Sequence, residues 1–439
     1  MRISQSGFAL RRQQLMDKMS PGSVAIVPSA SEVTRNRDVE YPFRQDSDFY
    51  YLTGFNEPDA LLVLIPSENL GQVVIFCRDR DPEMEIWHGY RAGPLGVCNQ
   101  YGADHAYPIA ELNERMVELL QGKDRLYYSI GTHEHLDTQV HGWLNGIRKN
   151  TRLGAEAPNE MVMLDTLLHE QRLFKSAEEA DLMRAAGRIS AEAHVRAMQV
   201  CKPGLTEYQL EAEITHHFAM NGCRLPAYSS IVGGGDNACV LHYTENQDVL
   251  KEGDLVLIDA GCELDYYAGD ITRTFPVSGK FSVEQKALYE LVLASQLACI
   301  EAIRPGVPWI CIHDKSVEVL THGLIDLGLL HGDPEDLIET GAYREFYMHR
   351  IGHWLGMDVH DVGDYKIDGE WRSLEPGMVL TVEPGIYVSP QNESVDEKWR
   401  GIGIRIEDDV LVTEDGYEVL SAAAPKGVDE IEALMSRSV

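Results

Sequence analysis

The segment DLVLIDAGCELDYYAGDITRTFPV (residues 254–277) contains two apolar runs, and each run meets an aspartate. The pattern predicts a hairpin in which Asp259 ends one strand and Asp270 opens the next. Asp259 directly continues the apolar run of residues 255–258, where a charge is costly unless it is paired or bound to a metal. Asp259 is therefore either a satisfied cap or ion pair, or a metal ligand.

A second segment, MHRIGHWLGMDVHDVG (residues 348–363), holds His349, His353 and His360 among apolar and glycine positions. A lone buried histidine is more often structural than functional. Three histidines so close together are difficult to assign to an ordinary surface, and imidazole is a common metal ligand. This cluster predicts a functional site.

Two further segments place acidic residues on strands. Glu383 ends an apolar run in MVLTVEPGIYV (residues 378–388), directly before a Pro-Gly turn. In GIGIRIEDDVLV (residues 401–412) the isoleucines alternate, so Arg405 and Glu407 share the opposite face. That face is either exposed to solvent or part of a site.

Taken together, these residues form a coherent donor set of four carboxylates and one imidazole: Asp259, Asp270, His353, Glu383 and Glu407. Oxygen-rich sets of this kind suit two divalent cations such as Mn²⁺ or Co²⁺ better than a thiolate-rich zinc site. The cluster is electrically neutral only with both cations bound, and without them the carboxylates raise one another's pKa. Two cations about 3.5–4 Å apart can share a water and lower its pKa.

Around these segments the sequence shows a weak internal repeat. A helix that stops at Lys-Pro-Gly (residues 202–204) is followed by another helix and then by strands. A helix capped by Ser282 and Gln285, which stops at Arg-Pro-Gly (residues 304–306), is followed by the same order of elements. The repeat predicts an α+β domain with two pseudo-twofold helix–helix–strand halves, their joint sheet covered by helices. The alternative is that two Pro-Gly helix stops recur by chance.

The first part of the chain alternates strand-like and helix-like segments, which predicts an α/β domain. Its clearest strands and helix are expected at residues 61–65, 73–77 and 109–120. Ser176 and Glu179 form a capping box that opens a long helix, so we place the boundary just before it. The predicted domains are residues 1–173 and 174–439.

Charge and composition exclude several classes of function. Lys plus Arg number 38 and Asp plus Glu number 70, which gives a net charge of −32 over 439 residues. A chain this acidic, without a local basic patch, is not expected to bind nucleic acid or an anionic membrane. No signal peptide or membrane span is visible, and no Cys-x-x-Cys pair occurs, so we expect a cytoplasmic protein.

Familiar catalytic and nucleotide-binding motifs give no alternative. The sequence contains no Walker A, His-Glu-x-x-His or Gly-x-Ser-x-Gly motif. Residues 233–238 (GGGDNA) formally match a dinucleotide-binding loop, but CVLHYTEN (residues 239–246) reads as a strand where a helix is required. We therefore expect a glycine-rich turn there.

The ordered blocks HYTEN (242–246), IDAGCE (258–263), GDITRTFPV (269–277), HWLGMDVHDVG (353–363), VLTVEPGIY (379–387) and GIGIRIEDD (401–409) resemble the pita-bread metallopeptidases. That group includes methionine aminopeptidase, prolidase and aminopeptidase P. The closest resemblance is to the Xaa-Pro aminopeptidases (aminopeptidase P), because EYPFRQDSDFYYLTGFNEPDA (40–60) also resembles their N-terminal domain. A small residue usually stands where this chain has Arg350, which could alter the pocket around His349.

The resemblance implies roles for individual residues. Asp259, Asp270 and Glu407 would bind or bridge the metals, and His353 and Glu383 would complete their shell. A hydroxide that bridges the metals would attack the carbonyl of the Xaa-Pro bond, and Glu383 would relay protons. The remaining roles are substrate orientation and oxyanion stabilisation by His242 and His360, a proline pocket shaped by His349, Tyr387 and Arg405, and contact with a neighbouring subunit's site by Asp38 and Trp87.

The resemblance thus implies a dinuclear aminopeptidase that acts on peptides with proline at position two. Mn²⁺ is the expected metal, with Co²⁺ or Zn²⁺ as alternatives, and the family suggests a homo-oligomer, a dimer or a tetramer. A prolidase restricted to Xaa-Pro dipeptides is the alternative within the same class. A non-catalytic scaffold or a metal-free, creatinase-like hydrolase is disfavoured because all five ligands are present.

Overall fold

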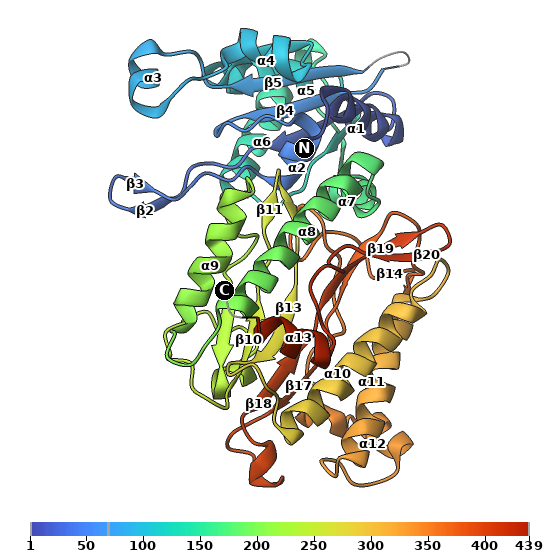
Figure 1. The fold of residues 1–439 in the computed structure, drawn as a ribbon. Coiled ribbons are helices and arrows are strands. Elements are labelled where there is room, and N and C mark those ends of the chain that lie inside the picture. Colours follow the sequence, from blue (N-terminus) through green and yellow to red (C-terminus); the bar gives the residue numbers. More distant parts are fainter. Residues whose placement is uncertain (1, 68–70, 438–439) are drawn as a thin grey trace. The chain divides into compact units, whose positions relative to one another are not determined.

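The computed structural model describes residues 2–67 and 71–437 of the chain. The chain divides into two compact units, residues 2–171 and residues 172–439 (Figure 1). Helix α7 (Asp165–Leu173) runs across this division.

The first unit is built on a mixed six-stranded sheet in the order β6-β5-β4-β1-β7-β8. These strands are β1 (Ser23–Pro28), β4 (Leu61–Ile65), β5 (Gln72–Cys77), β6 (His105–Pro108), β7 (Arg125–Tyr127) and β8 (Glu160–Val162). The unit also contains α1 (Gln5–Lys18), α2 (Ser47–Thr53), α3 (Pro82–His88), α4 (Gly93–Tyr101), α5 (Leu112–Leu120), α6 (Glu134–Arg148) and a small hairpin of β2 (Thr34–Asn36) and β3 (Val39–Glu40). Apolar side chains of α5 and α6 pack on the strands to form its core. The predicted strands at 61–65 and 73–77 are confirmed, and the predicted helix at 109–120 is a short 3₁₀ turn followed by α5.

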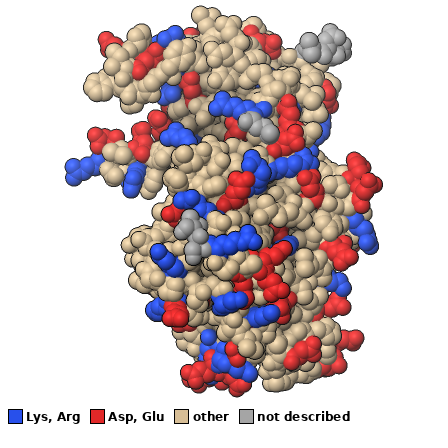
Figure 2. All heavy atoms as spheres, in the orientation of Figure 1, with Lys and Arg blue, Asp and Glu red and all other residues tan. Residues whose placement is uncertain are grey.

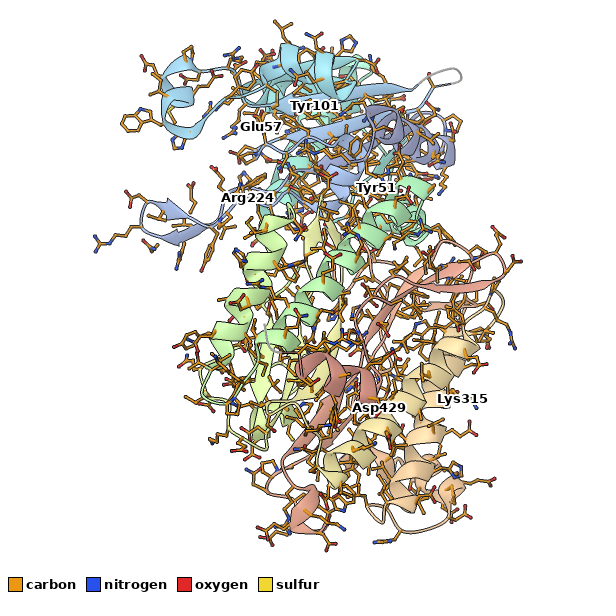
Figure 3. All side chains as sticks on the ribbon, viewed as in Figure 1. Tyr51, Glu57, Tyr101, Arg224, Lys315 and Asp429 are labelled. Atoms are coloured by element: carbon orange, nitrogen blue, oxygen red, sulfur yellow. The ribbon has the colours of Figure 1, made fainter. Side chains whose placement is uncertain are left out.

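Aromatic contacts complete this unit away from the main core. The guanidinium of Arg11 on α1 lies 4.1 Å from the ring centroid of Tyr51 on α2. Tyr101 packs edge-on against Phe55, with ring centroids 4.9 Å apart, and Figure 3 labels both tyrosines. These contacts add aromatic and cation–π interactions to the packing of the helices in this unit.

The second unit contains two successive sets of helices and strands. The first set is α8 (Ala177–Val200), α9 (Glu207–Met220), β9 (Ile231–Gly234), β10 (Leu255–Asp259), β11 (Glu263–Leu264), β12 (Tyr267–Ala268) and β13 (Thr272–Pro276). The second set is α10 (Val283–Ala302), α11 (Trp309–Asp326), α12 (Pro334–Thr340), β14 (Lys366–Ile367), β15 (Glu370–Trp371), β16 (Val379–Val382), β17 (Gly385–Val388), β18 (Ile402–Arg405), β19 (Asp408–Thr413), β20 (Gly416–Val419) and α13 (Val428–Met435). Each set starts with a helix pair and continues with a three-stranded sheet, β13-β10-β9 and β16-β19-β20 respectively. The predicted helix–helix–strand repeat is present.

Capping boxes open the first helix of each set, as the sequence predicts. Ser176 Oγ accepts from the backbone N–H of Glu179, whose carboxylate accepts from the Ser176 backbone at 2.9 Å. Ser282 and Gln285 make the same reciprocal pair at the start of α10. Each box satisfies two backbone donors that the first helical turn would otherwise leave unpaired.

The predicted hairpin pairs β10 with β13 in antiparallel register, with Asp259 opposite Thr272. The expectation that Asp270 opens the second strand is wrong by two residues, since β13 begins at Thr272. The small β11–β12 hairpin lies between β10 and β13. The alternating segment 401–412 is two strands rather than one, and Glu407 lies in the gap between them. The Glu407 N–H donates to the carbonyl of Thr272 at 3.0 Å, which joins the two sets.

The expectation for residues 239–246 is wrong. A 3₁₀ helix spans Gly235–Cys239, and the chain then continues through turns into irregular backbone that forms no strand up to residue 246. Gly233 explains this local structure, because a Cβ there would lie 2.9 Å from the backbone carbonyl of Asn237. The glycine permits the chain to fold tightly back on itself after β9.

The face of the molecule drawn in Figure 2 carries charges of both signs. On the face shown in Figure 2, Lys and Arg side chains alternate with Asp and Glu and form no continuous basic area among the described residues. Lys315 on α11, labelled in Figure 3, illustrates the pattern, since it pairs with Glu318 one turn away. No helix within the described residues is long and apolar enough to cross a membrane.

Gly261 tests the packing behind the β10–β13 hairpin. A Cβ on Gly261 would overlap the backbone carbonyl of Gly269, next to Asp270. Gly261→Ala should therefore lower the free energy of unfolding of the second unit by about 1–3 kcal/mol, the usual cost of overpacking. Denaturant unfolding measures this change. Gly142→Ala on α6 is the control, since apart from the local backbone of its own helix no atom of the described residues lies within 4 Å of the added Cβ. An equally small effect at Gly261 would contradict the prediction.

Candidate metal centre

A cavity of about 910 Å³ lies in the second unit, among the ends of strands β10, β16 and β18. Its lining includes all five predicted metal ligands and all of the predicted histidines: Asp259, Asp270, His353, Glu383, Glu407, His242, His349 and His360. Residues far apart in the sequence therefore meet at one place. The volume falls within the range of ordinary small-molecule and peptide sites.

Tyr228 connects the two aspartates of the hairpin. Its hydroxyl lies 2.5 Å from Asp259 Oδ1 and 2.5 Å from Asp270 Oδ1. A hydroxyl has one proton, so it can donate to only one of these carboxylates at a time. Two carboxylate oxygens this close to one oxygen atom mark a crowded, negatively charged site.

Three of the predicted ligands come from three different segments and converge. One donor atom each from Asp270, His353 and Glu407 lies within 4.8 Å of the other two. His353 Nε2 is 3.4 Å from Asp270 Oδ2 and 3.7 Å from Glu383 Oε1. The five residues thus surround one small volume.

Arg405 links the acidic cluster to the histidine wall. Its guanidinium donates to Asp259 Oδ2 at 2.6 Å, to the Tyr387 hydroxyl at 2.9 Å and to Thr272 Oγ1 at 3.1 Å. The Tyr387 hydroxyl in turn lies 2.9 Å from His349 Nε2. Arg405 and Glu407 are 3% and 2% exposed, so the alternative of a solvent-exposed strand face is wrong.

Burial disfavours the ionised form of the acidic groups when no cation is bound. Burial raises the pKa of Asp259 and of Glu407, and it raises the pKa of Glu383 to about 7. The neighbouring carboxylates act in the same direction, as the sequence predicts. Burial opposes the charged form of His353, but the hydrogen bond to Asp270 and the charge of Glu383 outweigh it and raise the pKa of His353 to about 9.

The donor set fits divalent cations. Carboxylate oxygens and one imidazole provide hard to borderline ligands, and no cysteine of the described residues lines the cavity. His353 Nδ1 lies 2.9 Å from the Trp354 carbonyl, which leaves Nε2 facing Asp270 and Glu383. A cation at Nε2 would replace the proton that these carboxylates otherwise favour.

The other predicted site residues divide into two groups. His360 stands beside His353 with ring centroids 4.3 Å apart, and burial lowers the pKa of His360. Burial and the charge of Arg405 lower the pKa of His349 to about 3, so its ring is neutral. Asp38 and Trp87 belong to the first unit and are exposed there, and their role stays a prediction.

Sequence reasoning missed several residues of the site. Thr272 Oγ1 donates to Glu407 Oε2 at 2.7 Å, and Thr381 Oγ1 accepts from the His353 backbone at 3.0 Å. The alternation of GDITRTFPV could have placed Thr272 on the site face. Tyr228 lies in LPAYSS, outside any periodic segment, and no local signal marks it.

Comparison with known proteins agrees with this geometry. The family model of metallopeptidase family M24 matches residues 181–414. The chain belongs to metallopeptidase family M24. The model of the aminopeptidase P N-terminal domain matches residues 8–127 of the same M24 chain.

Individual relatives match along almost the whole M24 chain. It is 50% identical to an Xaa-Pro aminopeptidase of Escherichia coli over 434 residues, which cover 99% of this chain and 98% of the relative. The structure of the Pseudomonas aeruginosa aminopeptidase PepP matches with a TM-score of 0.98 at 57% identity and covers 99% and 98% of the two chains. A zinc-substituted E. coli aminopeptidase P in complex with product matches with a TM-score of 0.97 at 49% identity and 99% coverage of both chains.

These findings confirm three expectations. The fold is an aminopeptidase P-type N-terminal domain followed by a pita-bread catalytic domain. The resemblance to the Xaa-Pro aminopeptidases is confirmed, and the M24 chain is a metallopeptidase and hence a hydrolase. The alternative of a non-catalytic scaffold of the same fold is disfavoured by these findings.

The raised pKa of Glu383 predicts how the metal-free protein responds to pH. Below its ordinary pKa of 4.5 the carboxyl is protonated in both the folded and the unfolded state. Between pH 4.5 and about 7 the folded state keeps a proton that the unfolded state releases, so the contribution of Glu383 to stability falls as pH rises. Glu383→Gln cannot ionise, so chelated wild type should lose stability relative to chelated Glu383→Gln across this window.

Denaturant unfolding at several pH values with excess chelator measures that difference. Saturating Mn²⁺ should remove the trend in the wild type, because the cation replaces the proton. A stability difference between the two chelated proteins that stays constant from pH 4.5 to 7 would contradict the assignment.

Proposed function

We propose that this chain hydrolyses the bond between an N-terminal residue and proline in peptides, with two divalent metal ions as cofactors. The observation that carries the proposal is the convergence of four carboxylates and one imidazole on the wall of a 910 Å³ cavity. The relatives from Escherichia coli and Haemophilus influenzae, which each match 99% of this chain, are Xaa-Pro aminopeptidases, and this supports the same activity here.

Asp259, Asp270, His353, Glu383 and Glu407 would hold the two metal ions, with Mn²⁺ as the expected metal and Co²⁺ or Zn²⁺ as alternatives. Bound ions would supply a nucleophile, by lowering the pKa of a water that they share, and would polarise the scissile carbonyl. Because one negative charge per ligand carboxylate balances two divalent ions, loading also relieves the repulsion among the acids.

Proline in the second position requires special handling by the protein. The Xaa-Pro bond is a tertiary amide without an N–H, and the ring restricts the chain to one backbone angle. Cleavage also requires a proton for the proline nitrogen. Glu383 lines the cavity with its Oε1 3.7 Å from His353 Nε2, and we assign it the relay of this proton.

The histidine side of the cavity would position the peptide. His242 and His360 would orient the substrate and stabilise the oxyanion. His349 and Tyr387 would shape the pocket for the proline ring, while Arg405 holds Tyr387 at 2.9 Å and pairs with Asp259. The cytoplasmic location, the dimeric or tetrameric state and the contributions of Asp38 and Trp87 stay predictions.

Metal dependence is tested with Xaa-Pro-Yaa peptides in the presence of Mn²⁺, with and without chelator. Wild type should be active with Mn²⁺ and inactive after exhaustive chelation. Glu407→Ala should lower kcat by more than the ~10–100-fold that loss of an outer partner of a metal ligand costs, and metal content should fall as well. Full activity of the chelated enzyme would support a metal-free hydrolase, and wild-type activity of Glu407→Ala would refute the metal assignment.

Substrate length distinguishes the aminopeptidase from a prolidase. An aminopeptidase with a cavity of this size should cleave Ala-Pro-Ala and longer peptides at least as well as the dipeptide Ala-Pro. The measurement is kcat/KM for each peptide under identical metal loading. Hydrolysis of the dipeptide alone would replace the aminopeptidase with a prolidase.

A further inference from the structure

A second, smaller pocket adjoins the catalytic cavity. It has a volume of about 130 Å³, and its lining includes His313, Arg344 and Tyr347 together with His349 and Arg350. His349 and Arg350 line both this side pocket and the catalytic cavity, so the two hollows meet at these two residues. The side pocket is rich in basic groups, in contrast to the acidic metal centre.

Arg350 carries a positive charge that no carboxylate of the described residues neutralises within 4.0 Å. The catalytic cavity has two arginines in its lining, and the other, Arg405, is paired with Asp259 at 2.6 Å. The guanidinium of Arg350 lies 6.0 Å from the Trp371 ring and forms no ion pair within the described part of the chain. Burial raises the pKa of the Asp314 carboxyl, and the charge of Arg350 acts in the opposite direction, but the two groups do not form a salt bridge.

Arg344 and His313 also line the side pocket. Arg344 likewise has no ion-pair partner among the described residues and lies 5.9 Å from the Tyr343 ring. His313 is 6% exposed, and its Nδ1 has no hydrogen-bond partner in the described structure. Burial and the charges of Arg350 and Arg344 lower the pKa of His313 to about 4, so the ring is neutral and offers a polar atom without adding charge.

We propose that Arg350, together with Arg344 and His313, forms a carboxylate-binding subsite for the residue that follows proline in Xaa-Pro-Yaa substrates. Guanidinium groups bind carboxylates through paired, charge-assisted hydrogen bonds, and two unpaired arginines beside a buried polar atom suit that geometry. The carboxylate is either the C-terminus of a tripeptide or the side chain of an acidic Yaa. This inference rests on the proposed aminopeptidase function.

The position of Arg350 relative to the metal centre is consistent with this role. His349 Nδ1 lies 3.9 Å from Glu383 Oε2, and His349 and Arg350 both line the catalytic cavity and the side pocket. The side pocket therefore begins beside His349, which the proposed function places at the proline ring. The residue after proline is the next part of an extended substrate along the chain.

The test compares three peptides that differ only in their carboxylates: Ala-Pro-Ala, Ala-Pro-Ala-amide and Ala-Pro-Asp-amide. Wild type should cleave Ala-Pro-Ala with a kcat/KM about 10-fold above the amide, a ratio expected for one charge-assisted contact at a partly exposed site. Arg350→Ala should bring this ratio to about one, because kcat/KM for Ala-Pro-Ala falls more than kcat/KM for the amide. Arg350→Lys should retain part of the preference, and Arg344→Ala should reduce it.

Arg304→Ala is the matched control, because Arg304 is exposed and lines neither cavity. It should keep the wild-type ratio. A preference for Ala-Pro-Asp-amide over Ala-Pro-Ala-amide that disappears in Arg350→Ala would show that the subsite accepts an acidic side chain as well as a C-terminus. If wild type cleaves the two amides equally well but still prefers Ala-Pro-Ala, the subsite binds only the C-terminal carboxylate.

Two results would overturn the subsite while leaving the proposed function intact. One is a wild type that cleaves all three peptides equally well. The other is an Arg350→Ala variant in which activity on Ala-Pro-Ala and its amide falls by the same factor, because this would indicate general damage near His349. A wild type that cleaves none of the three peptides would instead refute the aminopeptidase function.

Discussion

Mutual repulsion among buried carboxylates is the constraint on which the catalytic unit depends. Asp259, Asp270, Glu383 and Glu407 line one cavity, and burial in the absence of cations is costly for such a set. Most of these carboxylates are stabilised by hydrogen bonds and not by an ion pair with a basic side chain of their own. The Tyr228 hydroxyl lies within hydrogen-bond distance of Asp259 and Asp270. Thr272 donates to Glu407, Thr381 donates to Glu383, and Arg405 pairs with Asp259. The remaining negative charge is available to metal ions, so cation binding and the stability of the fold are linked.

The neighbouring residues Glu407 and Asp408 show how the same chemistry serves two purposes. Burial raises the pKa of Glu407, which faces the cavity. The pKa of Asp408 is lowered despite complete burial, because Arg273 and Lys426 hold its carboxylate at 2.7 Å each. Arg273 also donates to the Glu407 carbonyl, so the satisfied ion pair fixes the backbone of the unsatisfied ligand. The neutralised ion pairs of Asp408 thereby hold in place the backbone of Glu407, whose carboxylate has no basic partner among the described residues.

Local patterns predicted the elements that local physics determines. The capping boxes at Ser176 and Ser282 and the apolar strands depend on residues close in sequence, so they could be read directly. The four converging acids and His353 could be grouped because each interrupts an apolar run. Tyr228 could not, because its position between two aspartates is set by tertiary contacts. The segment 239–246 was misread for a similar reason, since the tight approach of Gly233 to Asn237 overrides the strand propensity of its apolar residues.

One continuous chain of hydrogen bonds joins the metal centre to its basic neighbour. Arg405 donates to Asp259 and to the Tyr387 hydroxyl, which lies 2.9 Å from His349 Nε2. The carbonyl of Arg350 lies 2.7 Å from His349 Nδ1 and can only accept, so neutral His349 carries its proton on Nδ1. His349 Nε2 then accepts from the Tyr387 hydroxyl, which in turn accepts from Arg405. A change in the charge of Asp259, such as cation binding, therefore acts on the hydrogen bonds that hold Arg405, Tyr387 and His349, and His349 is bonded to the backbone of Arg350.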